Sequence, residues 1–201
     1  MTHQRQERMR PARRWRLVLA AATEFAEHGF EQASVNRILA ACGMSKSSLY
    51  HVVDSKADLL DLVVRDLAAS IAGHWSPPAP DEFADDFWGT AGQVVAGLGA
   101  LAATDTDFGL LGRVFHLSAD SPATGEVFAA VGSWLDDVLA VGRRTGAVDD
   151  GLPADLQAQV VLAVLRAFDE WTLRHVTEMD GPFARDLVDH QLAALRRLLT
   201  R

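Results

Sequence analysis

The chain of 201 residues contains one cysteine, Cys42, and only two lysines, Lys46 and Lys56. A single cysteine excludes an internal disulfide and any zinc site built from several cysteines. No apolar run reaches the roughly 18 residues that a membrane-spanning helix requires. The N-terminus is basic, but no apolar segment of the signal-peptide kind follows it directly. These absences favour a cytoplasmic protein with no membrane partner.

Patterns of enzyme chemistry are also missing. The sequence has no nucleophile–base spacing, no cluster of metal ligands and no glycine-rich phosphate loop. Asp105-Thr106-Asp107 resembles a fragment of a calcium loop but lacks the rest of it, and a helix cap at Asp107 explains it better. We therefore expect a protein that is not an enzyme and holds neither a metal nor a cofactor.

The negative net charge conceals an uneven distribution. The whole chain carries −8, but residues 1–65 hold ten basic and seven acidic side chains and are net positive, whereas the remainder carries −11. A basic head on an acidic body allows one end of the molecule to approach phosphates while the other end is repelled.

Helical periodicity runs through the chain, and no convincing strand alternation interrupts it. The pattern predicts an all-α fold. Four helices are expected first: 13–28, then three that begin after the capping residues Ser34, Ser45 and Ser55, the last of them ending near residue 71. After a proline-containing break, five further helices are expected near 81–103, 107–117, 122–145, 153–178 and 182–200.

The second and third helices have the form of a helix-turn-helix, with Gly43 supplying the turn. The third helix is short and polar, as a helix that enters the major groove must be. Residues four apart on it share one exposed face, and helix N-termini attract phosphate. The predicted DNA-binding residues are Ser34, Ser45, Lys46, Ser47, Tyr50, His51 and Lys56.

A basic arm precedes the first helix and continues into it. Arms of this kind reach a minor groove or lie along the DNA backbone, although an arm can also be a solubilising tail. The arm's arginines are Arg5, Arg8, Arg10, Arg13, Arg14 and Arg16.

Residues 13–62 resemble the DNA-binding domain of the tetracycline-repressor (TetR) family of bacterial regulators. The resemblance is carried by Leu17-Val18, Ala20-Ala21, Phe25-Ala26-Glu27-His28-Gly29-Phe30, Ala33-Ser34-Val35, Ile38, Ala41, Gly43-Met44-Ser45-Lys46, Ser48-Leu49-Tyr50 and Ser55-Lys56 with Leu59-Leu60. One departure is Val53, where the family usually has phenylalanine.

The resemblance implies two domains, a helix-turn-helix DNA-binding domain over 1–65 and an all-helical domain over 66–201 for effector binding and dimerisation. It implies a homodimer formed by the last two helices and a small-molecule pocket among the middle ones. The large or polar candidates for an apolar or aromatic effector are Phe115, His116, Trp134, Phe168, Trp171 and His175.

The leading interpretation is a transcriptional regulator, of the repressor type, that leaves its double-stranded operator DNA when a small molecule binds. Two alternatives stay open. The first is a DNA-binding regulator without a small-molecule effector, and the second is an all-helical enzyme. A gel shift with promoter DNA separates the regulators from the enzyme.

Overall fold

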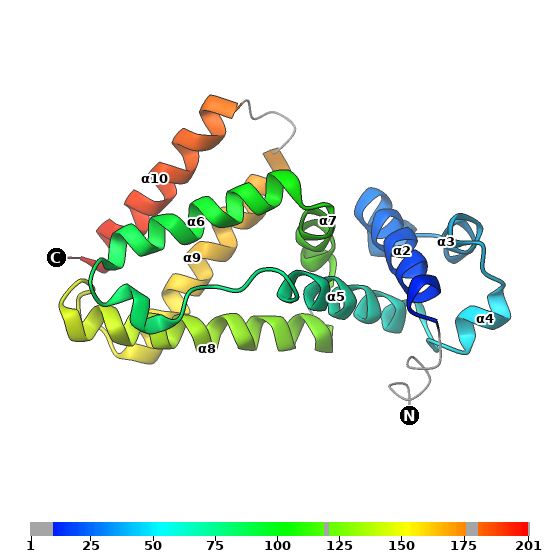
Figure 1. The fold of residues 1–201 in the computed structure, drawn as a ribbon, viewed down its shortest axis with the longest axis horizontal. Coiled ribbons are helices and arrows are strands. Elements are labelled where there is room, and N and C mark those ends of the chain that lie inside the picture. The colour runs from blue at the N-terminus through cyan, green and yellow to red at the C-terminus, as the bar shows by residue number, and fades with distance from the viewer. Residues whose placement is uncertain (1–9, 119–120, 176–180, 201) are drawn as a thin grey trace. The chain divides into compact units, whose positions relative to one another are not determined.

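The computed structural model describes residues 10–118, 121–175 and 181–200, and every regular element in these ranges is helical (Figure 1). This confirms the predicted all-α fold. In chain order the elements are α2 (Pro11–Gln32), α3 (Val35–Cys42), α4 (Lys46–Tyr50), α5 (Lys56–Ala72), η1 (Pro80–Phe83), α6 (Phe87–Thr104), α7 (Thr106–Phe115), η2 (His116–Ser118), α8 (Pro122–Thr145), α9 (Ala154–His175) and α10 (Gly181–Leu199).

The helices pack into two compact units. The first comprises residues 1–76 and 104–127, and the second comprises residues 77–103 and 128–201. The first unit therefore contains α7 and the start of α8 in addition to α2–α5. The expected division between residues 65 and 66 falls inside α5. It stays a prediction, because it concerns the functions of the two parts and not their packing.

Local capping explains where the first helices begin. The side-chain oxygens of Ser34, Ser45 and Ser55 accept backbone N–H groups of the first turns of α3, α4 and α5, as the sequence predicted. Gly43 follows α3 with φ 65° and ψ 35°, a left-handed conformation that favours glycine. The helix-turn-helix is thus determined largely by residues adjacent to its turns.

Helix boundaries differ from the prediction at three places. Gly29 has non-helical angles, φ 71° and ψ 170°, so the regular helix breaks there as predicted, but a further short turn carries α2 on to Gln32. The helix expected from residue 81 is divided into η1 and α6, because the side chain of Asp86 accepts the N–H of Gly89 at 2.9 Å and starts a new helix. Asp105, not Asp107, caps α7, since its carboxylate accepts the N–H of Phe108 at 2.9 Å.

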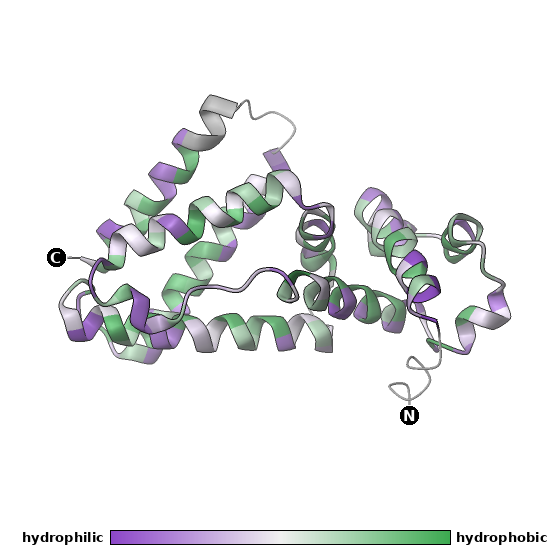
Figure 2. Cartoon of the chain, in the orientation of Figure 1, coloured by the Kyte–Doolittle hydropathy of each residue, from purple (hydrophilic) through white to green (hydrophobic). Residues whose placement is uncertain are grey.

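The core of the first unit is apolar and crosses from α2 to α8. Helices α2, α5 and α7 pack on one another, and Figure 2 shows the mixture of hydrophobic and hydrophilic residues along α2 and α5 that suits such amphipathic packing. Fully buried members include Leu17, Phe25 and Leu62, together with Val114 of α7. Val53, which stands where phenylalanine is usual, is also buried in this core.

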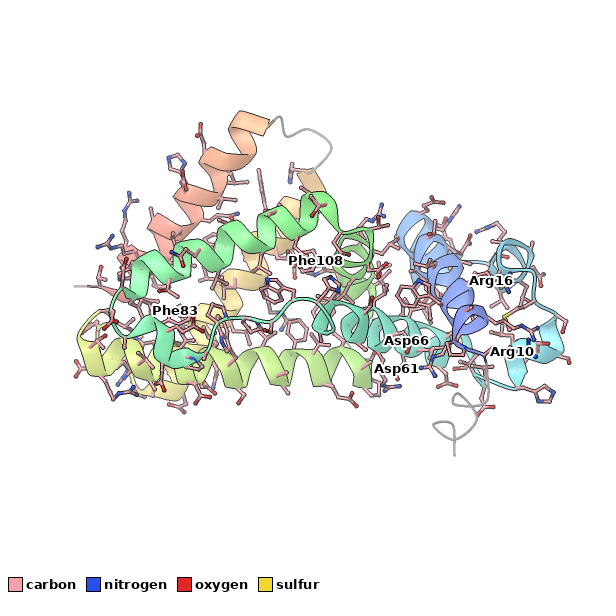
Figure 3. All side chains as sticks on the ribbon, viewed as in Figure 1. Arg10, Arg16, Asp61, Asp66, Phe83 and Phe108 are labelled. Carbon is pink, nitrogen blue, oxygen red and sulfur yellow. The ribbon has the colours of Figure 1, made fainter. Side chains whose placement is uncertain are left out.

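The second unit has a separate core lined by aromatic side chains. Phe83 of η1, labelled in Figure 3, contacts Phe87 and Trp134 with ring centroids 5.6 and 5.9 Å apart. The Trp134 indole N–H donates to the carbonyl of Pro78 at 2.9 Å. Near the end of α10, the carbonyl of Leu199 accepts the N–H of Asp149 at 2.7 Å. These bonds join segments far apart in sequence.

Among the described residues, no single helix combines the length and apolar composition needed to cross a membrane; α6 and α7 meet that requirement only when taken together as a bent pair.

Candidate nucleic-acid interface

The short helix α4 presents most of the predicted DNA-reading side chains. Lys46, Ser47 and His51 are exposed, and Tyr50 is 45% exposed although it is aromatic. Leu49 points the other way into the core and is 2% exposed. A helix that buries one leucine and exposes hydroxyl, ammonium and aromatic groups is suited to contact with base edges and phosphates.

Ser34, at the start of α3, is held by a buried carboxylate that was not predicted. The Ser34 N–H donates to Glu24 Oε1 at 2.7 Å, so this N–H is not available to a phosphate as was expected for a helix terminus. Its hydroxyl oxygen accepts the Arg37 N–H at 3.4 Å. The hydroxyl of Ser34 stays a predicted DNA contact, whereas its backbone N–H belongs to the fold.

Glu24 also pairs with Arg37, whose Nε and Nη2 both donate to its carboxylate. These hydrogen bonds from Arg37 lower the pKa of Glu24 from 4.5 to about 2, assisted by the Ser34 N–H and opposed by burial of the carboxyl group. Glu24 thus connects α2 to the start of α3 as a charged group. No sequence-local signal identifies it, because its partners lie ten and thirteen residues away.

Lys56 has a structural position that changes its expected role. Its ammonium donates to the carbonyls of Glu31 at 3.1 Å and Ala33 at 3.5 Å and lies 4.7 Å from the centroid of the Phe30 ring. The end of α2 is a favourable place for a cation, because helix C-termini carry partial negative charge. Lys56 therefore fastens the first turn of α5 to the end of α2, and phosphate contact by this residue stays a prediction.

Two arginines of the arm that the structure describes, Arg13 and Arg14, bind side chains of α4 and α5. Arg13 Nη2 donates to Ser48 Oγ at 3.2 Å, and Arg14 makes two hydrogen bonds to Asp66 of α5, at 2.6 and 2.5 Å. Figure 3 labels Arg10, Arg16 and Asp66 in this region. Arg5 and Arg8 lie outside the described residues, so their expected DNA contact stays a prediction.

The six predicted ligand-binding residues divide between the two units. Phe115 and His116 lie in the first, with ring centroids 6.3 Å apart. In the second, Trp134 and the half-buried Phe168 pack on the aromatic-lined core. Trp171 and His175 stack on each other at 4.2 Å near the end of α9, and Trp171 is 39% exposed. Neither unit contains all six residues, and their role in ligand binding stays a prediction.

Within the described ranges, no three side chains of histidine, cysteine, aspartate and glutamate gather where they could hold a metal ion.

The comparisons with known proteins agree with the geometry of the head. Residues 17–63 match the model of the family "Bacterial regulatory proteins, tetR family". These residues span α3 and α4 entirely, together with most of α2 and the first half of α5. No curated protein matches the chain significantly.

Several solved structures share the fold across nearly the whole chain. SmeT, the repressor of the Stenotrophomonas maltophilia multidrug efflux pump SmeDEF, is 16% identical with a TM-score of 0.64 over 90% of this chain and 89% of that chain. FadR from Bacillus subtilis, solved with stearoyl-CoA, is 18% identical with a TM-score of 0.66 over 92% and 97%. NalD from Pseudomonas aeruginosa, the secondary repressor of the MexAB-OprM efflux pump, is 16% identical with a TM-score of 0.64 over 94% and 97%.

At these identities the likeness concerns the fold, and the match over residues 17–63 adds the family of the head. The helix-turn-helix of this chain therefore matches the tetR family of bacterial regulatory proteins over residues 17–63, and the chain as a whole shares its helical fold with SmeT, FadR and NalD.

Proposed function

We propose that the protein is a sequence-specific DNA-binding repressor of transcription that a small-molecule ligand releases from its operator. The observation that supports this most directly is α4, a capped helix with Lys46, Ser47, Tyr50 and His51 exposed over a single buried leucine. The net positive charge of residues 1–65 adds long-range attraction to DNA. Such a regulator works in the cytoplasm, where its DNA is.

The functional unit we propose is a homodimer formed through α9 and α10. Large apolar side chains stand exposed on both helices of the single chain, with Leu156 at 44%, Trp171 at 39% and Leu198 at 49%. A second copy would remove this apolar surface from water. Two copies would also supply two recognition helices, which must lie about 34–36 Å apart, or a multiple of that distance, to enter the major groove on the same side of the duplex.

The effector we propose is apolar or aromatic, and some of Phe115, Trp134, Phe168 and Trp171 contact it. SmeT and NalD repress multidrug efflux pumps, and Bacillus subtilis FadR was solved with stearoyl-CoA. Those ligands and targets belong to those proteins; for this chain they suggest which compounds to test first. His116 and His175 are the candidates for a polar group of the ligand.

Salt dependence tests the proposed DNA surface. If a dimer neutralises about six to ten phosphates, log K against log salt should have a slope near roughly −5 to −9. Lys46→Ala should weaken binding to all sequences alike and flatten that slope by about one for each phosphate that is no longer neutralised. Ser47→Ala, which removes no charge, should change sequence preference with the slope retained. Fluorescence anisotropy with a selected and a shuffled duplex measures both, and a flat salt response in the wild type would contradict the proposal.

Reciprocity tests the ligand-driven release. A ligand that weakens DNA binding by about 5- to 150-fold must itself bind the DNA complex more weakly by the same factor. Aromatic dyes and acyl-CoA esters can be screened by quenching of the five tryptophans, then titrated with and without the selected duplex. Equal ligand affinity in both states would exclude a compound as effector. Unchanged binding by Trp134→Phe and Trp171→Phe would show that the assigned residues are wrong.

The alternatives give different results in the same assays. A regulator without a small-molecule effector would bind the selected duplex but show no coupled ligand. An all-helical enzyme would turn over a substrate and show no affinity for DNA. The family of the head favours the regulators.

A further inference from the structure

The recognition helix has little packing of its own. α4 has five residues, far fewer than the roughly 12–15 that an isolated helix needs to be even marginally stable. Leu49 is its one buried side chain. Apolar packing is not directional, so a single buried leucine sets the depth of the helix better than its rotation. The rotation determines which side chains meet the bases.

A directional contact to α4 comes from the first turn of α2. Arg13 Nη2 donates to Ser48 Oγ at 3.2 Å, across 35 positions of sequence. The same Ser48 oxygen accepts the hydroxyl of Ser45 at 2.9 Å, and Ser45 Oγ accepts the N–H of Ser48 at 3.2 Å. The guanidinium of Arg13 is therefore bonded to Ser48 in the first turn of α4, and Ser48 is in turn bonded to the capping residue Ser45.

The first turn of α2, which carries Arg13, is itself held in place by an ion pair to α5. The neighbouring Arg14 forms a bidentate ion pair with Asp66 of α5. A bidentate pair is stronger and more specific in its geometry than a single hydrogen bond. Consecutive residues of α2 thus connect it to α5 on one side and to α4 on the other. Arg13 is half-buried, as a residue enclosed between helices would be, whereas Arg16 on the same helix is exposed.

We propose that Arg13 is a positioning residue for sequence recognition: through Ser48 it holds the rotation of α4 that aims Ser47 and Tyr50 at the bases. The inference rests on the proposed DNA binding. It differs from a simple phosphate contact by an arm arginine, which would strengthen binding to every sequence equally. A guanidinium has five N–H donors, and the bond to Ser48 uses one of them. Arg13 could therefore position α4 and contact a phosphate at the same time, so the experiment must separate these two effects.

The experiment compares Arg13→Ala, Ser48→Ala, the double variant and the matched control Arg16→Ala in the full chain. The probes are a duplex enriched from a random pool on the wild-type protein and a shuffled duplex of the same composition. Discrimination is the ratio of the two affinities, measured at several salt concentrations. Ser48→Ala removes the acceptor but no charge, and it keeps the bond from the Ser48 N–H to Ser45, so α4 stays capped.

Under the proposal, Arg13→Ala and Ser48→Ala each lower discrimination by about fivefold or more. Ser48→Ala does so with an unchanged salt slope, the double variant loses no more discrimination than Ser48→Ala alone, and Arg16→Ala keeps the wild-type ratio. Wild-type discrimination in Ser48→Ala, or additive losses in the double variant, would overturn it. Circular dichroism checks that each variant is folded. If Arg13→Ala is unfolded, the result for Ser48→Ala alone decides the proposal. A wild type that enriches no duplex contradicts the proposed function instead.

Discussion

Leu198→Asp should convert the proposed dimer into a folded monomer of 21.8 kDa. In the single chain Leu198 is 49% exposed, so the aspartate remains hydrated and the fold loses little. In the proposed dimer the same position is covered, and a buried unpaired charge is strongly unfavourable. Because two half-sites bound together gain avidity, the monomer should bind the selected duplex about 100-fold or more weakly.

Light scattering, circular dichroism and DNA titration measure this result together. The matched control is Leu152→Asp, which places the same charge at a side chain that is 46% exposed but lies before α9. Leu195 shows why the choice of residue matters, because it is 8% exposed within the second core and its replacement by aspartate should unfold the chain. A Leu198→Asp protein that keeps twice the monomer mass would refute the assigned dimer face.

Glu24→Gln should destabilise the head by about 1–3 kcal/mol at pH 7. A pKa lowered from 4.5 to about 2, at about 1.4 kcal/mol per unit, sets the upper limit. The Arg37 side chain is 52% exposed, so solvent screening reduces the gain. Glutamine retains the size of the side chain and an oxygen for the Ser34 N–H, so the difference reports mainly the charge.

The pH dependence has a definite sign. The unfolded chain binds a proton at Glu24 more readily than the folded chain, so the stabilisation is complete above about pH 5 and is lost as pH falls from 4.5 towards 2. Urea unfolding at fixed protein concentration, from pH 7 to pH 3, should therefore show wild type and Glu24→Gln converging as pH falls. Glu27→Gln, an exposed glutamate on the same helix, is the control. A constant difference across this range would contradict the assignment.

The sequence predicted the features that depend on neighbouring residues. Ser34, Ser45 and Ser55 cap helices because each accepts an N–H only three residues ahead, and α8 has the predicted bounds, Pro122–Thr145. The bond from Arg13 to Ser48 joins side chains 35 residues apart, and no periodicity indicates such a partner. From the sequence, the rarity of lysine and the position of Lys56 in a first turn predict a phosphate contact. The sequence does not reveal the carbonyls at the end of α2, because they become neighbours of Lys56 only after folding.

The discontinuous composition of the first unit has a consequence for synthesis of the protein on the ribosome. Leu110, Val114 and Ala123 cover the same core as Leu17 and Phe25, so that core stays incomplete until residues near 127 have emerged. Roughly 50 residues separate this point from residue 76, which is about 3–10 seconds at translation rates of about 5–20 residues per second. During that interval the nascent chain exposes apolar surface of α2 and α5, and it is then a natural client for chaperones.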